Sequence, residues 1–169
     1  QTMIFLLLIF LNFNLIVTSE ILFCTYKEDA EGYHCDLEIS NNYGIDDFSS
    51  VYGRRPVDKN VIKVSTVGFS LNFPSIVCAN FINLSEILSS ALGISKITEN
   101  SFKNCENLEL LNLDFNAIFK IDEKSFKNNQ KMLELTMKNS QITSLPEKLF
   151  GNLKNLRFLI LRRMRFHSY

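Results

Sequence analysis

Residues 108–131 read LELLNLDFNAIFKIDEKSFKNNQK, and this stretch of 24 residues contains the pattern that decides the fold. Leucine occupies its first, fourth and sixth positions, the alternation expected of a short strand with one buried face. Isoleucine stands at the eleventh and fourteenth positions, and phenylalanine at the nineteenth. A unit this short cannot bury so many apolar side chains alone, so the pattern predicts units that stack on one another.

The same pattern recurs with a constant step of 24 residues from Leu84 to the end of the chain. The units begin at Leu84, Leu108, Met132 and Leu156. The apolar fourth position holds Ile87, Leu111, Leu135 and Leu159, and the nineteenth holds Phe102, Phe126 and Phe150. We interpret these columns as the core of the stack. Ser89 is a polar exception at the sixth position, and we expect Asn116, at the ninth, to satisfy backbone groups of the next unit.

This pattern resembles the leucine-rich repeat, LxxLxLxxNxL in a unit of 20–29 residues, and the resemblance covers Leu84–Tyr169. It implies an α/β solenoid of horseshoe shape. A parallel sheet would form the concave side, with short helical or irregular segments and a phenylalanine spine on the convex side. The whole chain is similar to secreted insect leucine-rich-repeat proteins. That similarity implies protein recognition, in innate immunity, signalling or adhesion.

The chain divides into a leader, a cap and the repeats. We expect a signal peptide at 1–19, an N-terminal cap at 20–60, a degenerate coil at 61–83, full units at 84–107, 108–131 and 132–155, and a partial unit at 156–169. Residues 3–17 are apolar and uncharged, which favours a signal peptide over a membrane anchor or a buried core helix, because a span needs roughly 20 such residues. The partial last unit predicts a natural chain that continues past Tyr169, or a truncated product.

The four cysteines allow three disulfide pairings. Cysteine-bounded caps are a habit of the family, so we favour Cys24–Cys35 as the staple of a cap hairpin. Cys78 and Cys105 fall at inward positions of successive coils, which favours a second bridge between them. The alternative is that Cys105 is only a small apolar core residue. Asn83-Leu84-Ser85 is a glycosylation sequon, so Asn83 is the predicted glycan site.

The composition and motifs argue against several classes of function. Lysine and arginine total 18 and aspartate and glutamate total 18, so the chain lacks the positive charge on which nucleic-acid binders rely. We find no GxSxG, P-loop, HExxH or clustered metal ligands, and we therefore expect no enzyme, cofactor or metal site. The zero net charge conceals an asymmetry. Residues 20–50 hold eight acidic side chains against Lys27 alone, and residues 156–169 hold four arginines and no acid.

The remaining candidate for function is the concave face, onto which positions 2, 3, 5, 7 and 8 of each unit would project. The predicted partner-binding residues are Glu86, Leu110, Asp114, Phe115, Glu134, Lys138, Phe158, Arg162 and Arg163. Phe115 and Phe158 are the strongest candidates, because exposed aromatics beside arginine are typical hot-spot residues. Some of the charges could instead form ladders within the protein, such as Asp114–Lys138.

We therefore expect an extracellular, secreted recognition module whose partner is a protein ligand or co-receptor. The alternative is the N-terminal ectodomain of a membrane receptor, with a cell-surface location. That alternative requires an apolar span after residue 169. An enzyme would require a catalytic domain beyond Tyr169.

Overall fold

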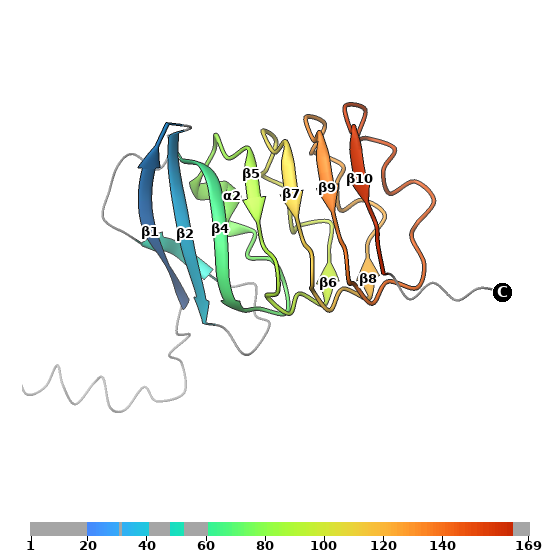
Figure 1. Ribbon diagram of the computed structural model, residues 1–169, viewed down its shortest axis with the longest axis horizontal. Helices are drawn as coiled ribbons and strands as arrows, with labels where there is room; N and C mark the ends of the chain where they lie inside the picture. The colour runs from blue at the N-terminus through green and yellow to red at the C-terminus, as the bar shows by residue number, and fades with distance from the viewer. Residues whose placement is uncertain (1–19, 31, 41–47, 53–60, 164–169) are drawn as a thin grey trace, which may run out of the picture.

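The computed structural model describes residues 20–30, 32–40, 48–52 and 61–163 (Figure 1). The predicted signal segment 1–19 and the last six residues of the partial unit lie outside the described residues, as does much of the stretch between 41 and 60.

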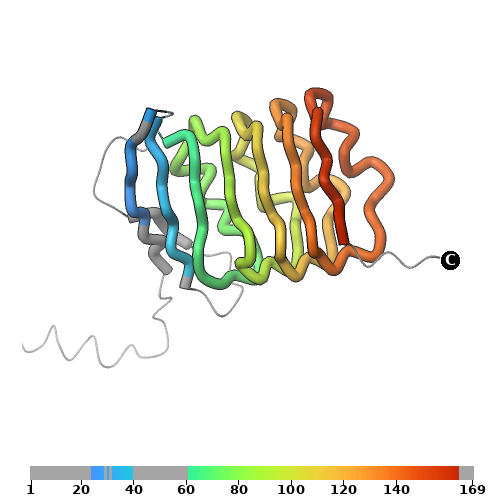
Figure 2. The backbone as a smooth tube through the Cα atoms, in the orientation of Figure 1, coloured from blue at the N-terminus to red at the C-terminus, as the bar shows by residue number. Residues whose placement is uncertain are grey.

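An eight-stranded sheet runs through the whole described chain, from the cap to the last unit. Its strands are β1 (Glu20–Asp29), β2 (Gly32–Ser40), β3 (Phe48–Tyr52), β4 (Val61–Phe69), β5 (Glu86–Leu88), β7 (Leu110–Asn112), β9 (Glu134–Thr136) and β10 (Phe158–Ile160). They lie in the order β10-β9-β7-β5-β4-β2-β1-β3. All neighbouring pairs are parallel except β1 and β2, which form an antiparallel hairpin. Figure 2 shows the chain turning once per strand, so the predicted solenoid with a parallel sheet is confirmed.

The 24-residue register of the sequence is the register of the sheet. Ile87 pairs with Leu111, Leu111 pairs with Leu135, and Leu135 pairs with Leu159. The first three of these side chains are fully buried, whereas Leu159 on the last strand is partly exposed. The fourth-position column therefore forms the inner layer of the core, as the repeat pattern predicted.

The convex side of the described coils consists mainly of turns. It carries one short helix, α2 (Ile76–Asn80), and a small parallel sheet of β6 (Lys96–Ile97) and β8 (Lys120–Ile121). The helical content that the α/β resemblance implied is thus limited to five residues of the first coil. The molecule is accordingly a β-solenoid of short strands and turns.

An aromatic spine runs beneath the convex turns. The ring centroids of Phe73 and Phe102 lie 4.9 Å apart, and those of Phe102 and Phe126 lie 5.9 Å apart. All three side chains are fully buried. Counting back 24 residues from Phe102 points to Cys78 as the spine position of the first coil, which is wrong. Helix α2 occupies that part of the coil and Phe73, just before it, supplies the ring.

Asn116 joins two coils through a buried carboxamide. Its Oδ1 accepts the backbone N–H groups of Leu92 at 3.1 Å and Ile94 at 3.0 Å, and its Nδ2 donates to the carbonyls of Ser89 at 2.7 Å and Leu113 at 2.9 Å. The expectation that it serves the next coil was wrong in direction, because the groups outside its own coil belong to the preceding one. The chain turns away from the sheet at this point, and its backbone groups have no strand partner.

The polar residue in the sixth column is also satisfied. Ser89 is fully buried, and its Oγ accepts a hydrogen bond of 3.0 Å from the Oγ1 of Thr66, which is buried at the matching place in β4. Because two small hydroxyls pair with each other, neither is left unsatisfied in the core.

The N-terminal hairpin extends the sheet. β2 pairs with β4, so the cap continues the same ladder as the repeats. Cys24 and Cys35 are buried and form the predicted disulfide, with Cα atoms 5.5 Å apart on diagonal positions of β1 and β2. Lys27 and Asp36 form an ion pair on the opposite face of the hairpin. The cap therefore presents one buried and one solvated face, as the repeats do.

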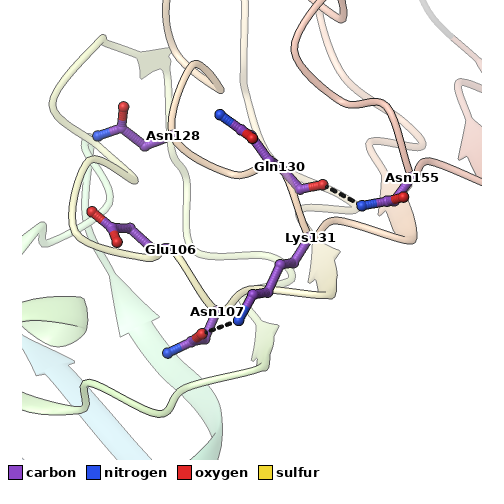
Figure 3. A pocket seen from close by; sticks show the side chains of 6 residues that line it. All are labelled: Glu106, Asn107, Asn128, Gln130, Lys131 and Asn155. Carbon is purple, nitrogen blue, oxygen red and sulfur yellow. Dashed lines mark hydrogen bonds between the residues drawn. The ribbon is translucent and has the colours of Figure 1, made fainter.

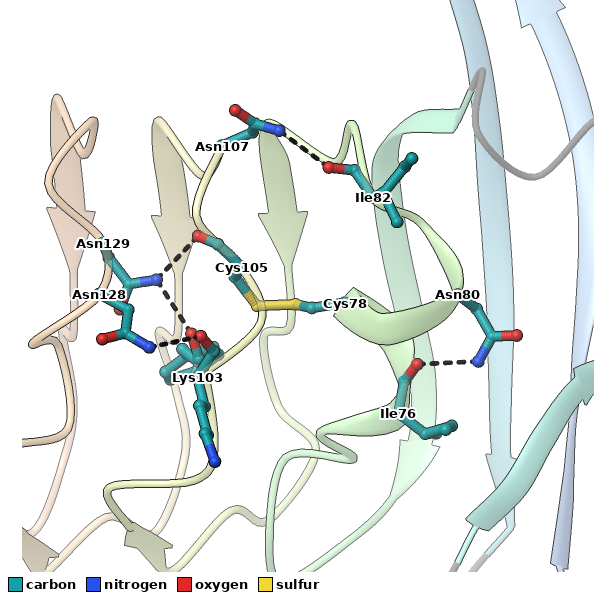
Figure 4. The surroundings of a disulfide bond; sticks show 10 residues. Ile76, Cys78, Asn80, Ile82, Lys103, Cys105, Asn107, Asn128 and Asn129 are labelled. Carbon is teal, nitrogen blue, oxygen red and sulfur yellow. Dashed lines mark hydrogen bonds between the residues drawn. A yellow bond between two sulfur atoms is a disulfide. The ribbon is translucent and has the colours of Figure 1, made fainter.

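The second predicted disulfide joins α2 to the following coil (Figure 4). Cys78 and Cys105 are bonded and buried, with Cα atoms 5.0 Å apart. Asn129, one coil further on, is fully buried and donates through Nδ2 to the carbonyl oxygens of Phe102 at 3.1 Å and Cys105 at 2.8 Å. The turn that carries Cys105 is thus fixed from both neighbouring coils.

Candidate functional site

The outward face of the eight-stranded sheet, which we call the strand face, is built from positions 3 and 5 of each coil and the residues that flank them. Position 4 points into the core, so its neighbours on either side point outward. The third-position row runs across four coils and the cap: His34, Lys63, Glu86, Leu110, Glu134 and Phe158. This is the face that the sequence pattern assigned to the concave side.

The predicted partner-binding residues differ widely in exposure on this face. Phe115 and Phe158 expose 62% and 59% of their surface, and Arg162 and Arg163 are exposed as well. The half-buried members are Glu86, Leu110, Glu134 and Lys138. The third-position row brings Glu86, Leu110, Glu134 and Phe158 side by side, while Phe115 and Arg163 lie beyond the strand ends.

Asp114 departs from the expected exposure. It is 4% exposed, and its carboxylate accepts the backbone N–H of Lys138 at 2.8 Å and pairs with the Lys138 ammonium at 2.9 Å. Asp114 in turn donates its own N–H to the Oδ1 of Asn112 at 2.9 Å. The predicted Asp114–Lys138 ladder is present, and the acid serves the stack itself because the chain is already turning at position 7.

A second ion pair ties the cap to the first repeat on the same face. The Lys63 ammonium lies 3.1 Å from the Glu86 carboxylate, and both side chains are mostly covered. The two residues stand opposite each other in β4 and β5. The charge of Glu86 is therefore largely balanced within the protein, and the acids that remain for a partner lie further along the face.

A groove of about 250 Å³ crosses the face at the start of β5, β7, β9 and β10. Its apolar surface comes from Leu110, Leu133 and Phe158, and its walls carry the carboxylates of Glu109 and Glu134 and the guanidinium of Arg157. The prediction missed Leu133, Glu109 and Arg157 as site residues. All three stand at position 2, so the signal that could have found them is the second-position column.

A backbone feature recurs at the far end of each strand. Position 8 adopts a left-handed conformation in every described repeat, with φ of 57° at Ala91, 58° at Phe115, 55° at Asn139 and 55° at Arg163. Asparagine tolerates this region better than a bulky side chain does. Phe115 therefore exposes its ring from a position where the backbone does not favour phenylalanine.

The convex edge carries a larger but polar groove of about 490 Å³ (Figure 3). Its side chains bond to one another or to neighbouring coils. Asn155 donates to the carbonyl of Gln130 at 2.9 Å, and Lys131 donates to the Oδ1 of Asn107 at 2.6 Å. Asn107 bonds the carbonyl of Ile82 at 2.8 Å in the same way. We interpret this edge as a ladder of amides that holds the coils in register.

Chemistry other than binding finds little support in the described residues. That part of the chain contains no group of three or more histidine, cysteine or acidic side chains placed to hold a metal ion. It also contains no helix of the length and apolarity that crossing a bilayer requires. The predicted glycan acceptor Asn83 is exposed in the turn before β5.

Comparison with known proteins places this geometry in a known fold. The Leucine rich repeat family model matches residues 106–165. Among solved structures, the chain is similar to a chain of the Toll–Spatzle complex, described as a molecular hub in Drosophila development and innate immunity. The fold is a leucine-rich-repeat solenoid. The similarity has a TM-score of 0.52 at 12% identity and covers 63% of this chain and 18% of that chain. No curated protein matches the chain.

These findings support a leucine-rich-repeat family. They do so through the matched units and the shared fold, since 12% identity bears on the fold alone. The present chain spans less than a fifth of the length of the Toll-complex chain. Leucine-rich-repeat folds of this kind are protein-interaction scaffolds, and they are not typically enzymatic. The similarity to an extracellular receptor complex, together with the disulfides, is consistent with an extracellular protein.

Proposed function

We propose that this chain is an extracellular recognition module that binds a protein partner through the strand face, without chemical turnover. The observation that carries the proposal is the groove between Leu110 and Phe158, where apolar and charged side chains from neighbouring coils converge. Exposed aromatic and arginine side chains at the centre of such a surface are the usual anchors of protein interfaces.

The composition of the groove suits a protein partner better than a small molecule. The groove is shallow and open along the strands, whereas a small ligand is usually enclosed by its pocket. Phe158 and Leu110 supply the apolar centre, and Glu134 and Arg157 supply charges of both signs around it. An apolar centre with a charged rim is the typical anatomy of a protein interface.

The scaffold holds these side chains in fixed positions. The third-position residues are spaced by the sheet ladder, and each coil is fixed to its neighbours by buried groups such as Asn116 and Asn129. A surface that is already ordered loses little conformational entropy when a partner binds. The module can therefore bind without the cost of rearranging its backbone.

The compartment follows from the same proposal. Both disulfides need an oxidising environment to persist. Residues 1–19 would act as the signal peptide, and Asn83 would carry a glycan in that compartment. We place the protein in innate-immune recognition or signalling, with a protein ligand or a co-receptor as its partner.

The test is a binding screen followed by two matched variants. The chain is displayed as a multimer and screened against a panel of recombinant extracellular proteins from its source. A partner found in this way should bind Phe158→Ala at least about tenfold more weakly, because the substitution removes the central apolar anchor. Ile82→Ala is the control, since Ile82 is an exposed apolar side chain of the same 59% exposure outside the sheet. Equal affinity of both variants would refute the use of the strand face.

The second candidate is the N-terminal part of a membrane receptor ectodomain. The similarity to a chain of which this chain covers 18% favours it, because the matched region of that chain is one part of a longer array. Sequencing the transcript beyond the codon for Tyr169 tests the idea. Further 24-residue units followed by about 20 apolar residues would support a receptor, and a terminal cap without such a span would support the secreted module.

A further inference from the structure

We propose a second docking surface, on the rim where the strands end, for an acidic peptide segment of a partner that also carries aromatic or aliphatic side chains. This surface, the aromatic rim, consists of Val67, Phe69, Phe115 and Phe119 with Lys96 and Lys120 beside them. It lies along the edge of the solenoid at which β6 and β8 are found, away from the groove at the strand starts (Figure 1).

The apolar part of the rim is unusually exposed for a soluble protein. Val67, Phe69, Phe115 and Phe119 expose 60%, 44%, 62% and 50% of their surface. They come from three consecutive coils. An apolar cluster of this kind, bordered by polar residues, is characteristic of an interaction site.

Small residues in the middle coil give the rim its shape. Ala91 and Gly93 occupy that coil between Phe69 on one side and Phe115 on the other. The ring of Phe69 lies directly over Gly93, where a Cβ would come within 2.4 Å of it. Gly93 also has φ of 85°, a conformation that suits glycine. The aromatic rings therefore stand on either side of a low centre.

The charge beside these rings is positive. Lys96 and Lys120 stand directly opposite each other in β6 and β8, and both are exposed. The Lys96 ammonium lies 5.6 Å from the centre of the Phe119 ring, and among the described residues it has no carboxylate partner. Lys120 has only a long contact of 3.7 Å with Asp122. Like charges directly opposite each other repel, and an incoming carboxylate would relieve this repulsion.

The nearest carboxylate on the neighbouring turn does not alter this balance. Glu99 is paired with Lys127 at 3.5 Å. A second copy of the chain would be a poor occupant, because a two-fold contact of the rim with itself would bring four lysines together. An anionic membrane would gain only about 1 kcal/mol from each of two lysines. An acidic segment with apolar side chains satisfies both the rings and the ammonium groups.

The probe is a phage-displayed library of random 12-residue peptides. It is selected in parallel on the wild-type chain, on the double variant Phe119→Ser with Lys96→Glu, and on Phe158→Ala. We expect peptides that combine carboxylates with aromatic or aliphatic side chains to be enriched on the wild type and on Phe158→Ala, and to be lost on the double variant. A synthetic peptide from this set should bind Lys96→Glu alone at least about tenfold more weakly. Thermal melts of the variants establish that they remain folded.

Several outcomes would overturn the proposal. One is the absence of peptides that depend on the double variant, and another is a dependent set without acidic residues. Binding to phosphatidylserine vesicles without binding to acidic peptides would make the rim a membrane contact. A dimer in sedimentation that is lost in the double variant would make it a contact between copies. In each case the strand-face function would still stand or fall on Phe158→Ala, so the two failures are distinguishable.

Discussion

Substitution of Asn116 by alanine tests whether the coils are held together by buried polar groups as well as by apolar packing. Asn116 is almost completely buried, and its carboxamide makes four hydrogen bonds of 3.1 Å or less. Three of these reach the preceding coil, at Ser89, Leu92 and Ile94. Alanine would leave two buried N–H groups and two carbonyl oxygens without this partner.

The magnitude follows from the count of bonds. A hydrogen bond contributes about 1 kcal/mol net, so the loss of four gives about 4 kcal/mol of unfolding free energy. Native domains have total stabilities of about 5–15 kcal/mol, so this single change would remove a large part of the reserve. Asn116→Leu should cost a similar amount, because it fills the space but leaves the same backbone groups unpaired.

The same column supplies a matched control. Ser140 occupies the corresponding position one coil further on, is also buried, and makes one hydrogen bond of 2.9 Å, to the carbonyl of Met137. Ser140→Ala should therefore cost about 1 kcal/mol. The assay is urea denaturation followed by circular dichroism, with equal slopes required before the free energies are compared.

The decisive quantity is the difference between the two substitutions, which we expect to be about 3 kcal/mol. If Asn116→Ala and Ser140→Ala agreed within 1 kcal/mol, the reasoning from the coil-to-coil hydrogen bonds would be refuted. A benign Asn116→Leu with a costly Asn116→Ala would show that the cavity, and not the lost hydrogen bonds, sets the cost.

Three further predictions concern the spine, the left-handed position and the second disulfide. Phe126→Ala should lower the unfolding free energy by about 3–5 kcal/mol, whereas Phe115→Ala should leave the thermal melt nearly unchanged, and the reverse ranking would invert our inside and outside assignment. Phe115→Gly should raise stability by up to about 1 kcal/mol in the same melts, since φ is 58° there, and a loss would show that the ring contributes to folding. Replacing Cys78 and Cys105 together by alanine should cost about 3–4 kcal/mol in urea denaturation, because the bridge closes a loop with a sequence separation of 27, and a cost below 1 kcal/mol would contradict this.

The part of the fold that could be predicted from the sequence is the part that repeats. Each 24-residue step tests the same assignment again, so the pairing of Ile87 with Leu111 and of Leu111 with Leu135 followed from the apolar columns alone. The Cys24–Cys35 and Cys78–Cys105 bridges were also predicted correctly. Repetition makes local physics decisive, because a stacked unit contacts mainly its neighbours.

The segments outside the repeat were less predictable. The coil before Leu84 is irregular, and this misplaced Phe73, whose ring begins the spine. The pairing of β2 with β4 depends on two segments without a shared sequence pattern, so only the hairpin could be foreseen. Asn129 gave no signal in the sequence, since its role depends on the carbonyl groups that surround it.

The candidate site shows the same division. Alternation along a strand placed Phe158 and Leu110 outward, because the rule holds within the strand. It failed for Asp114, because position 7 lies where the chain begins to turn and the backbone of the next coil needs an acceptor. The aromatic rim escaped notice for a related reason. Its members stand at different positions of three coils, and only the folded turns bring them together.

The most direct test of the central claim is hydroxyl-radical footprinting of the chain with and without a partner recovered from the extracellular panel. Oxidation reports the exposure of individual aromatic and aliphatic side chains in one experiment. The account predicts that Phe158 and Leu110 become protected in the complex, while Ile82, equally exposed to Phe158 but outside the sheet, is oxidised as before. Protection of Ile82 with unchanged oxidation of Phe158 would contradict binding through the strand face.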